Sequence, residues 1–172
     1  ETYKTMLLTK IRRISKNAMN PKIKCGANYI NGRYALLEAK SKGADLPMLK
    51  NKNGYISESS GACVFLVKKG LILTPSLDCD ILESITRDTV IKIFSENNYK
   101  IEQRLISETE FNESDEIFLC GSTAEITPIK LITNNNFKIG DTTKFIFDEY
   151  QLAITAKKYN MYSWTTKLDV KL

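Results

Sequence analysis

The spacing of apolar residues changes several times along the chain, and these changes predict a mixed fold. Between residues 45 and 74, apolar residues alternate with polar ones or form short unbroken runs, as in strands. Elsewhere, spacings of three and four residues are typical of helices with one apolar face. We expect strands over residues 3–9, 46–49, 64–67, 71–74, 99–106, 116–120, 126–132 and 137–139, helices over residues 29–42, 86–97 and 143–158, a loop over residues 10–20 and a turn over residues 134–136. Because strands and helices are mixed without strict alternation, we expect an α+β fold, in the form of an irregular α/β barrel.

Residues with special backbone preferences mark the ends of several elements. Pro47 cannot donate a hydrogen bond to a neighbouring strand, so its strand should lie at a sheet edge or contain a bulge. The pair Asn53-Gly54 favours a tight turn. Ser107 and Glu110 have the spacing of a capping box, in which each side chain bonds to the backbone of the other residue. A short helical turn should therefore begin there.

The helix expected over residues 29–42 carries its large apolar residues on one side. Ile30, Tyr34 and Leu37 are separated by four and three residues, which places them on the same face of a helix. Ala35 and Leu36 widen this face. Such a face is normally buried against a sheet or another helix. We therefore expect this side of the helix to be packed in the interior.

The composition is that of a globular protein and excludes several classes of function. Of the 172 residues, 42% are hydrophobic and 26% are charged, which suits one soluble domain with a sizeable core. The sequence has no histidine, which excludes Ser-His and Cys-His nucleophile systems and histidine metal sites. The four cysteines lack the C-x-x-C spacing of a zinc site, so we expect reduced, mostly buried thiols and no bound metal.

The formal net charge of +5 is modest. The densest basic run extends from Lys10 to Lys24 and includes Arg13, but it lacks interleaved aromatic residues and a nucleic-acid motif. We expect it to be a solvated face or a phosphate-attracting rim, with no nucleic-acid partner. No membrane span or signal peptide is recognisable, which favours the cytoplasm or an organelle matrix and no membrane contact. The chain begins almost directly with an apolar run at residues 6–8, which indicates a piece of a larger protein.

Lys24 is the first candidate for chemistry. It stands between apolar Ile23 and Cys25 and is followed by a flexible Gly26 and the first helix. We expect an extended segment that turns sharply into the helix, with a partly desolvated amine. Desolvation disfavours the ammonium form and frees the lone pair for attack on a carbonyl. The alternative is a lysine at the end of an edge strand, where its charge discourages pairing between sheets.

Three small polar loops are further candidates. Glu58 begins a Glu-Ser-Ser-Gly loop that either directs a carboxylate at a ligand or forms an exposed turn. Residues 84–86 begin a helix, whose free N–H groups either bind an anion or are simply capped. Residues 121–123 offer backbone and hydroxyl donors or form a tight turn. A lysine, an acid and two anion-binding loops are together the groups that a pyridoxal phosphate site requires.

Four runs of residues resemble, in order and spacing, the class IV aminotransferases. They are Lys24-Cys25-Gly26-Ala27-Asn28-Tyr29, Asn53-Gly54-Tyr55-Ile56-Ser57-Glu58, Ile85-Thr86-Arg87-Asp88 and Gly121-Ser122-Thr123-Ala124-Glu125-Ile126-Thr127-Pro128. Within this family, residues 14–164 are most similar to the branched-chain amino acid aminotransferases. The resemblance implies the barrel-like large domain of fold-type IV enzymes, with pyridoxal 5'-phosphate as cofactor.

The resemblance also implies roles for three residues around the cofactor ring. Lys24 matches the catalytic lysine that forms a Schiff base with the cofactor and later moves the substrate proton. Tyr29 matches the tyrosine that hydrogen-bonds the phenolic oxygen of the cofactor. Glu58 matches the acid that keeps the pyridine nitrogen protonated.

Five more residues are implied at the phosphate and the substrate. Leu82, Ile85 and Thr86 are expected to bind the cofactor, the last two through backbone and hydroxyl groups at its phosphate. Ser122 stands where threonine is commoner and should keep the hydroxyl contact. The backbone amides of Ser122 and Thr123 match those that bind the substrate carboxylate.

The function implied by the resemblance is transamination between branched-chain L-amino acids and 2-oxoglutarate by a homodimer. Residues 1–14 are expected to be a stub of the family's N-terminal domain and its linker, and residues 15–172 the C-terminal cofactor domain. Two departures, Ala62-Cys63 and Glu83-Ser84, leave the preferred substrate open. The alternatives are a D-amino acid aminotransferase, an aminodeoxychorismate lyase of the same fold, or a catalytically incomplete fragment.

Overall fold

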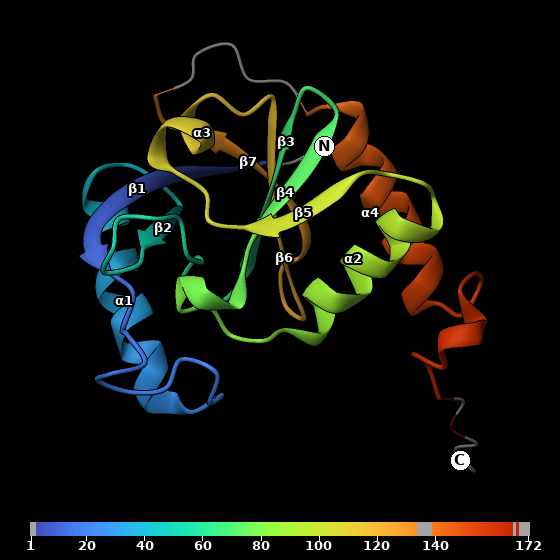
Figure 1. Cartoon of the computed structure of the whole chain (residues 1–172), viewed down its shortest axis with the longest axis horizontal. Coiled ribbons are helices and arrows are strands. Elements are labelled where there is room, and N and C mark those ends of the chain that lie inside the picture. The colour runs from blue at the N-terminus through green and yellow to red at the C-terminus, as the bar shows by residue number, and fades with distance from the viewer. Residues whose placement is uncertain (1–2, 134–138, 167, 169–172) are drawn as a thin grey trace.

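One mixed sheet and the helices packed on it make up the computed structural model, which describes residues 3–133, 139–166 and 168 (Figure 1). The strands are β1 (Lys4–Arg12), β2 (Leu46–Lys50), β3 (Cys63–Lys68), β4 (Leu71–Pro75), β5 (Ile101–Arg104), β6 (Glu116–Gly121) and β7 (Glu125–Leu131). The helices are α1 (Gly26–Ser41), α2 (Ile85–Glu96), α3 (Glu108–Asn112) and α4 (Asp141–Ile154), with the 3-10 turns η1 (Leu77–Cys79) and η2 (Asn160–Tyr162). The expected combination of α and β elements is confirmed.

The seven strands are hydrogen-bonded in the order β2-β1-β7-β6-β3-β4-β5. Both parallel and antiparallel pairs occur, since β1 runs parallel to β2 and β7 while β3 pairs antiparallel with β4 and β6. Strand β2, which contains Pro47, lies at one edge of the sheet, as the sequence predicts. Strand β1 precedes the expected domain boundary at residue 14 and nevertheless lies inside the sheet.

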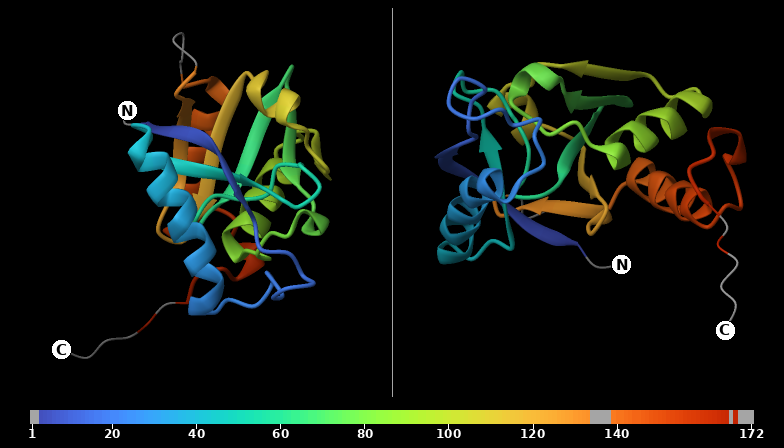
Figure 2. Two further views of the ribbon diagram at one scale, coloured as in Figure 1. Left: turned by 90° about the vertical axis from the view of Figure 1, so that its left-hand side faces the viewer. Right: turned by 90° about the horizontal axis from the view of Figure 1, so that it is seen from below.

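The central strands β3 and β6 are buried on both faces. In β3, Cys63 and Phe65 point into a core shared with α2 and α4, whereas Val64 points into a second core on the opposite face. The ring of Phe65 stacks on that of its cross-strand neighbour Phe118, with centroids 5.1 Å apart. Figure 2 shows α2 and α4 together on one side of the molecule and α1 on another. The sheet is therefore a wall between two cores, which explains its continuous apolar strands.

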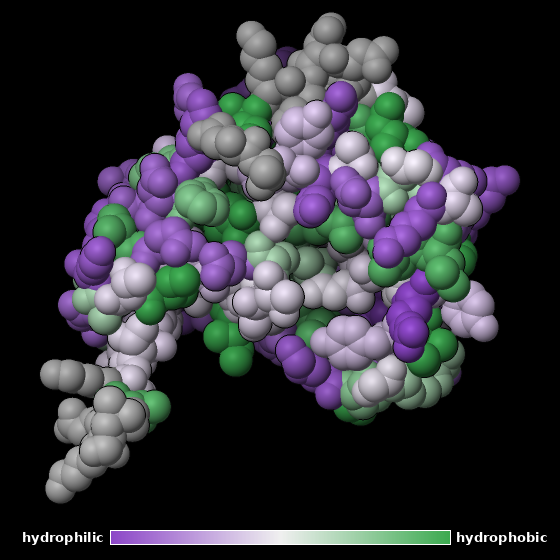
Figure 3. Space-filling view, turned by 180° about the vertical axis from the view of Figure 1, so that it is seen from behind, coloured by the Kyte–Doolittle hydropathy of each residue, from purple (hydrophilic) through white to green (hydrophobic). Residues whose placement is uncertain are grey.

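The expected buried face of α1 is confirmed at Ala35 and is wrong for its large residues. Ile30, Tyr34 and Leu37 are 48%, 61% and 65% exposed, whereas Ala35 is fully buried and Leu36 half-buried. The side that faces the sheet contains small residues, among them Gly32 and Ala35. Helix α1 lies so close to the loop before β3 that large side chains are excluded from this side. On the face shown in Figure 3, apolar side chains likewise reach the surface at separate places among hydrophilic ones.

Several element ends differ from the prediction. Strand β1 continues to Arg12, into the expected loop, and α1 begins at Gly26, three residues early. Helix α4 ends at Ile154 instead of residue 158, because the left-handed backbone of Ala156 cannot continue a helix. The turn expected at 134–136 and most of the strand expected at 137–139 lie outside the described residues.

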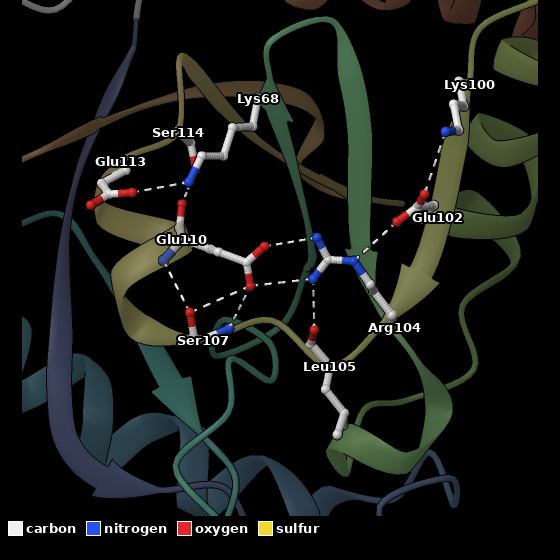
Figure 4. A network of polar contacts seen from close by, with 9 residues as sticks. All are labelled: Lys68, Lys100, Glu102, Arg104, Leu105, Ser107, Glu110, Glu113 and Ser114. Carbon is white, nitrogen blue, oxygen red and sulfur yellow. Dashed lines mark hydrogen bonds and ion pairs between the residues drawn. The ribbon is translucent and has the colours of Figure 1, made fainter.

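The predicted capping box is confirmed and belongs to a larger polar network (Figure 4). The Glu110 backbone N–H donates to Ser107 Oγ at 3.1 Å. The Glu110 carboxylate in turn binds the Arg104 guanidinium, with a shortest distance of 2.7 Å. This network ties α3 to the end of β5 on the side remote from α2.

Three of the four cysteines are buried, as expected, and Cys25 is half-buried. Within the described part of the chain, no helix is both long and apolar enough to cross a membrane.

The close approach of α1 gives a prediction about stability. A Cβ on Gly32 would lie 2.8 Å from the Ser60 carbonyl oxygen and 2.9 Å from Ser60 Cα, which is backbone that cannot rotate away. We expect Gly32→Ala to lower the free energy of unfolding by about 1–3 kcal/mol in urea titrations. Gly26→Ala is the matched control, because a Cβ there would meet no atom within 4 Å. Equal stability of Gly32→Ala and Gly26→Ala would contradict this view of the packing.

Candidate functional site

A cleft of about 200 Å³ lies where the loops before α1 and α2 meet the ends of the central strands. Both loops run along the lower side of the view in Figure 1. Of the residues predicted from the sequence, six line the cleft: Lys24, Tyr29, Glu58, Leu82, Ile85 and Ser122. Segments far apart in the sequence are thus brought to one place. The volume is below the roughly 300–1,000 Å³ of drug-sized sites and suits a ligand with a single ring.

Lys24 directly follows a turn. The Ile23 N–H donates to the Asn20 carbonyl at 3.2 Å, and the Cys25 N–H donates to the Ile23 carbonyl at 2.9 Å. The expected extended segment is confirmed only at Cys25, whose backbone is extended and leads directly into α1, whereas residues 20–23 form a turn. Lys24 belongs to no strand, so the alternative edge strand is wrong. Lys24 is exposed, contrary to the expected partly desolvated amine, and it makes no hydrogen bond or ion pair with any residue that the structure describes. Its local setting leaves it free to reach a ligand in the cleft.

Glu58 is the buried acid of the cleft. Its carboxylate Oε1 lies 2.8 Å from Arg13 Nη2, and Oε2 accepts a hydrogen bond of 3.1 Å from the Leu82 N–H. The residue is only 5% exposed, so the exposed-turn alternative is wrong. Burial raises the pKa of Glu58 to about 6, against the opposing effects of the Arg13 charge and the Leu82 N–H.

Arg13 was missed by the sequence analysis, which placed it in a solvated basic run. The residue is 9% exposed, and its guanidinium joins several parts of the chain. Besides Glu58, it donates to the carbonyls of Asp80 at 3.2 Å and Asn28 at 3.3 Å. The alternation of a strand could have indicated that Arg13 and Arg12 face opposite ways. Nothing in the sequence links Arg13 to an acid so distant along the chain.

The beginning of α2 supplies backbone donors at the cleft. Ser84 is the N-cap, and its Oγ accepts from the Arg87 N–H at 3.3 Å. Ile85, the first helical residue, lines the cleft. Thr86 does not line it, because its hydroxyl is turned towards the buried Tyr150, where it opposes the rise in the pKa of Tyr150 that burial causes. Of the predicted pair, Ile85 lines the cleft and Thr86 does not.

The two predicted residues of the loop after β6 line different cavities. Ser122 lines the cleft, whereas Thr123 lines a neighbouring groove together with Leu36 and Thr127. Gly61 and Ala62 border both cavities and separate them. The side chains of Ser122 and Thr123 thus serve different surfaces, although their backbone amides are adjacent.

The groups that line the cleft fit pyridoxal phosphate chemically. An amine, a phenol and a carboxylate are available from Lys24, Tyr29 and Glu58. Each Glu58 oxygen accepts one bond and retains a further lone pair for a ring N–H. In addition, the buried side-chain oxygen of Asn28 has no partner among the described residues, so the cleft wall has unused acceptor capacity. The open first turn of α2 suits a phosphate.

Comparison with known proteins agrees with this chemistry. The family model described as amino-transferase class IV matches residues 1–132. A probable branched-chain-amino-acid aminotransferase from Aquifex aeolicus is 36% identical over 159 residues, which are 90% of this chain and 51% of the relative. The branched-chain-amino-acid aminotransferase of Escherichia coli K12 is 29% identical over 160 residues, 91% of this chain and 52% of the enzyme.

Solved structures give the same result. The holo-form of the branched-chain amino acid aminotransferase from Thermobaculum terrenum superposes with a TM-score of 0.92 at 36% identity, over 96% of this chain and 55% of that one. The branched-chain aminotransferase from the archaeon Thermoproteus uzoniensis, solved with norvaline, has a TM-score of 0.90 at 32% identity, over 96% of this chain and 56% of that one. The chain therefore spans about half the length of the relatives it matches. It belongs to the class IV aminotransferase family, as a homologue of branched-chain amino acid aminotransferases.

Proposed function

We propose that this chain is the cofactor-binding portion of an enzyme that transfers amino groups between branched-chain L-amino acids and 2-oxoglutarate with pyridoxal phosphate. The observation that carries the proposal is the meeting of Lys24, Tyr29 and Glu58 in one cleft beside the start of α2. The names of the similar enzymes support the branched-chain substrate. We further propose that the whole enzyme is a homodimer and that the isolated chain turns over little substrate.

Lys24 is the proposed catalytic residue. When bound, pyridoxal phosphate supplies an aldehyde carbon and an electron-withdrawing ring. The Lys24 amine would hold the cofactor covalently and, once free, would remove the proton from the α-carbon of the amino donor and later deliver a proton to the α-carbon of the amino acid formed from the 2-oxo acid. Both tasks need a neutral amine.

Glu58 and Arg13 are proposed to stabilise the positive charge on the protonated ring nitrogen of the cofactor. A carboxylate that faces the ring nitrogen stabilises its proton and so preserves the electron-withdrawing character of the ring. The Arg13 guanidinium favours the ionised form of Glu58, since the pair is only 2.8 Å apart and almost free of solvent. Arg13 therefore acts through Glu58 as a positioning residue.

The phosphate and the substrate carboxylate are assigned to backbone donors. The N–H groups of Ile85 and Thr86 at the first turn of α2 would hold the phosphate, and the Ser122 hydroxyl and Leu82 would contribute further contacts to the cofactor. The helix dipole favours an anion there. The adjacent amides of Ser122 and Thr123 would bind the substrate carboxylate. Since the Thr86 hydroxyl points to Tyr150, its contribution comes from the backbone unless the side chain rotates.

The catalytic assignment predicts the effect of two lysine substitutions. In the full-length enzyme, Lys24→Ala should abolish transamination, because it removes both the covalent attachment and the base. Lys16→Ala is the matched control, since Lys16 is also an exposed lysine of the segment between β1 and α1 but does not line the cleft. It should retain activity close to that of the wild type. A coupled assay with L-leucine, L-valine, D-alanine and aminodeoxychorismate would measure both the loss and the substrate class. Turnover by Lys24→Ala, or a preference for the last two substrates, would contradict the assignment.

The buried acid predicts a pH dependence of stability. Because the folded chain holds the Glu58 proton more tightly than the unfolded chain, ionisation of Glu58 costs stability as the pH rises. The loss should amount to about 2 kcal/mol and occur between the ordinary pKa of about 4.5 and the folded value of about 6. Urea titrations from about pH 4 to about pH 7 should show wild type losing this stability relative to Glu58→Gln. A constant difference between the two proteins would rule out the raised pKa.

A further inference from the structure

We infer that Asn28 is a positioning residue for Lys24, because it fixes the turn of residues 20–23 that directly precedes Lys24. The inference rests on the proposed function, because it assigns a supporting residue to the proposed catalytic amine. It is carried by hydrogen bonds that connect the first turn of α1 with the backbone on the N-terminal side of Lys24.

The Asn28 side-chain amide bonds to both ends of the turn that precedes Lys24. Its Nδ2 donates to the carbonyl of Ile23 at 2.7 Å and to the carbonyl of Asn20 at 3.0 Å. The Ile23 carbonyl also accepts from the Cys25 N–H, so the peptide groups on both sides of Lys24 belong to this arrangement. Among the described residues, Asn28 is the only one outside residues 20–24 whose side chain bonds to that turn.

Asn28 is itself firmly held. It is the third residue of α1 and only 3% exposed. Its backbone carbonyl accepts a hydrogen bond from Arg13, the guanidinium that binds Glu58. One residue therefore connects the turn of Lys24 with the ion pair of the buried acid. This connection sets the separation of the proposed amine and acid across the cleft.

The Lys24 side chain is long and flexible and has no partner among the residues described. Its amine can therefore be placed only through the position of its backbone. Orienting a reacting group in this way is worth large factors in rate. The orientation of the Asn28 amide follows from its two acceptors, because the opposite orientation would set Oδ1 against two carbonyl oxygens. The remaining Oδ1 is buried and without a described partner.

Asn28→Asp tests the inference with little change in volume. The carboxylate keeps an oxygen on Cγ but removes both donated bonds and repels the two carbonyls. An acidic residue in the first turn of α1 is favourable for the helix, so the helix itself should persist. The chain would be incubated with pyridoxal phosphate, reduced with borohydride, and mapped by mass spectrometry. The readout is the ratio of adduct at Lys24 to adduct at Lys22, with the urea midpoint measured in parallel.

We expect wild type to label Lys24 in preference to Lys22, and Asn28→Asp to lower that ratio by about tenfold, a modest part of what orientation can contribute. Asn97→Asp is the control, because Asn97 Nδ2 also donates twice, to the Ile93 carbonyl and to the Tyr159 hydroxyl, away from the cleft. It should lose stability without a change in the labelling ratio. Asn28→Ser serves if Asn28→Asp does not fold, since its short side chain cannot reach both carbonyls.

The outcomes separate the inference from the function on which it rests. A wild-type labelling ratio in a folded Asn28→Asp or Asn28→Ser variant would overturn the role of Asn28 and leave the assignment of Lys24 intact. A wild-type chain that labels Lys24 no more than Lys22 would overturn both. A ratio that also falls in Asn97→Asp would show that general loss of stability, not Asn28, is responsible.

Discussion

The cleft depends on the burial of one guanidinium. Arg13 follows the end of β1 and reaches the acid Glu58, the carbonyl of Asn28 at the start of α1 and the carbonyl of Asp80 after η1. Each of these groups comes from a different part of the chain. Burying a charge is costly unless it is paired and fully hydrogen-bonded, and removing one partner of a buried pair typically costs about 3–5 kcal/mol. The segments that surround Arg13 are thus held in one arrangement, and this arrangement forms the wall of the site.

The sheet supplies the rigid frame on which these segments rest. Because β3 and β6 are covered on both faces, their ends cannot move without disturbing two cores at once. The loop after β6 leaves directly from that strand, the loop before α2 enters a helix packed on β6, and the loop before α1 connects β1 with a helix packed on β1 and β2. Close packing of Gly32 against Ser60 adds a further restraint, since it fixes α1 relative to the loop of Glu58. An exposed lysine and a buried acid held by two hydrogen-bonding partners therefore line the same cleft.

Local signals in the sequence were sufficient for much of the fold. The hairpin of β3 and β4, the capping box of Ser107 and Glu110, and the edge position of β2 each follow from residues close together in the chain. The apolar face of α1 was misjudged because periodicity identifies a face but not which face meets the sheet. Ala35 of the predicted face is buried together with Gly32, while the larger residues of that face remain exposed, because α1 approaches the loop of Ser60 too closely for them.

The sequence likewise indicated some residues of the cleft and missed others. Motifs brought Lys24, Tyr29 and Glu58 together correctly, because their resemblance to a family carries three-dimensional information that spacing alone does not. Arg13 was missed because its partners are distant in sequence and nothing in a basic run distinguishes a buried arginine from exposed ones. The direction of the Thr86 side chain was not predictable, because it depends on a tertiary neighbour, Tyr150.

The most direct test of the account is a spectrum of the purified chain with pyridoxal phosphate, recorded before and after borohydride reduction and followed by peptide mapping. The account predicts a visible absorbance band that disappears on reduction and a stable adduct on Lys24. An adduct spread evenly over the exposed lysines, or no band at all, would contradict the claim that this cleft binds the cofactor.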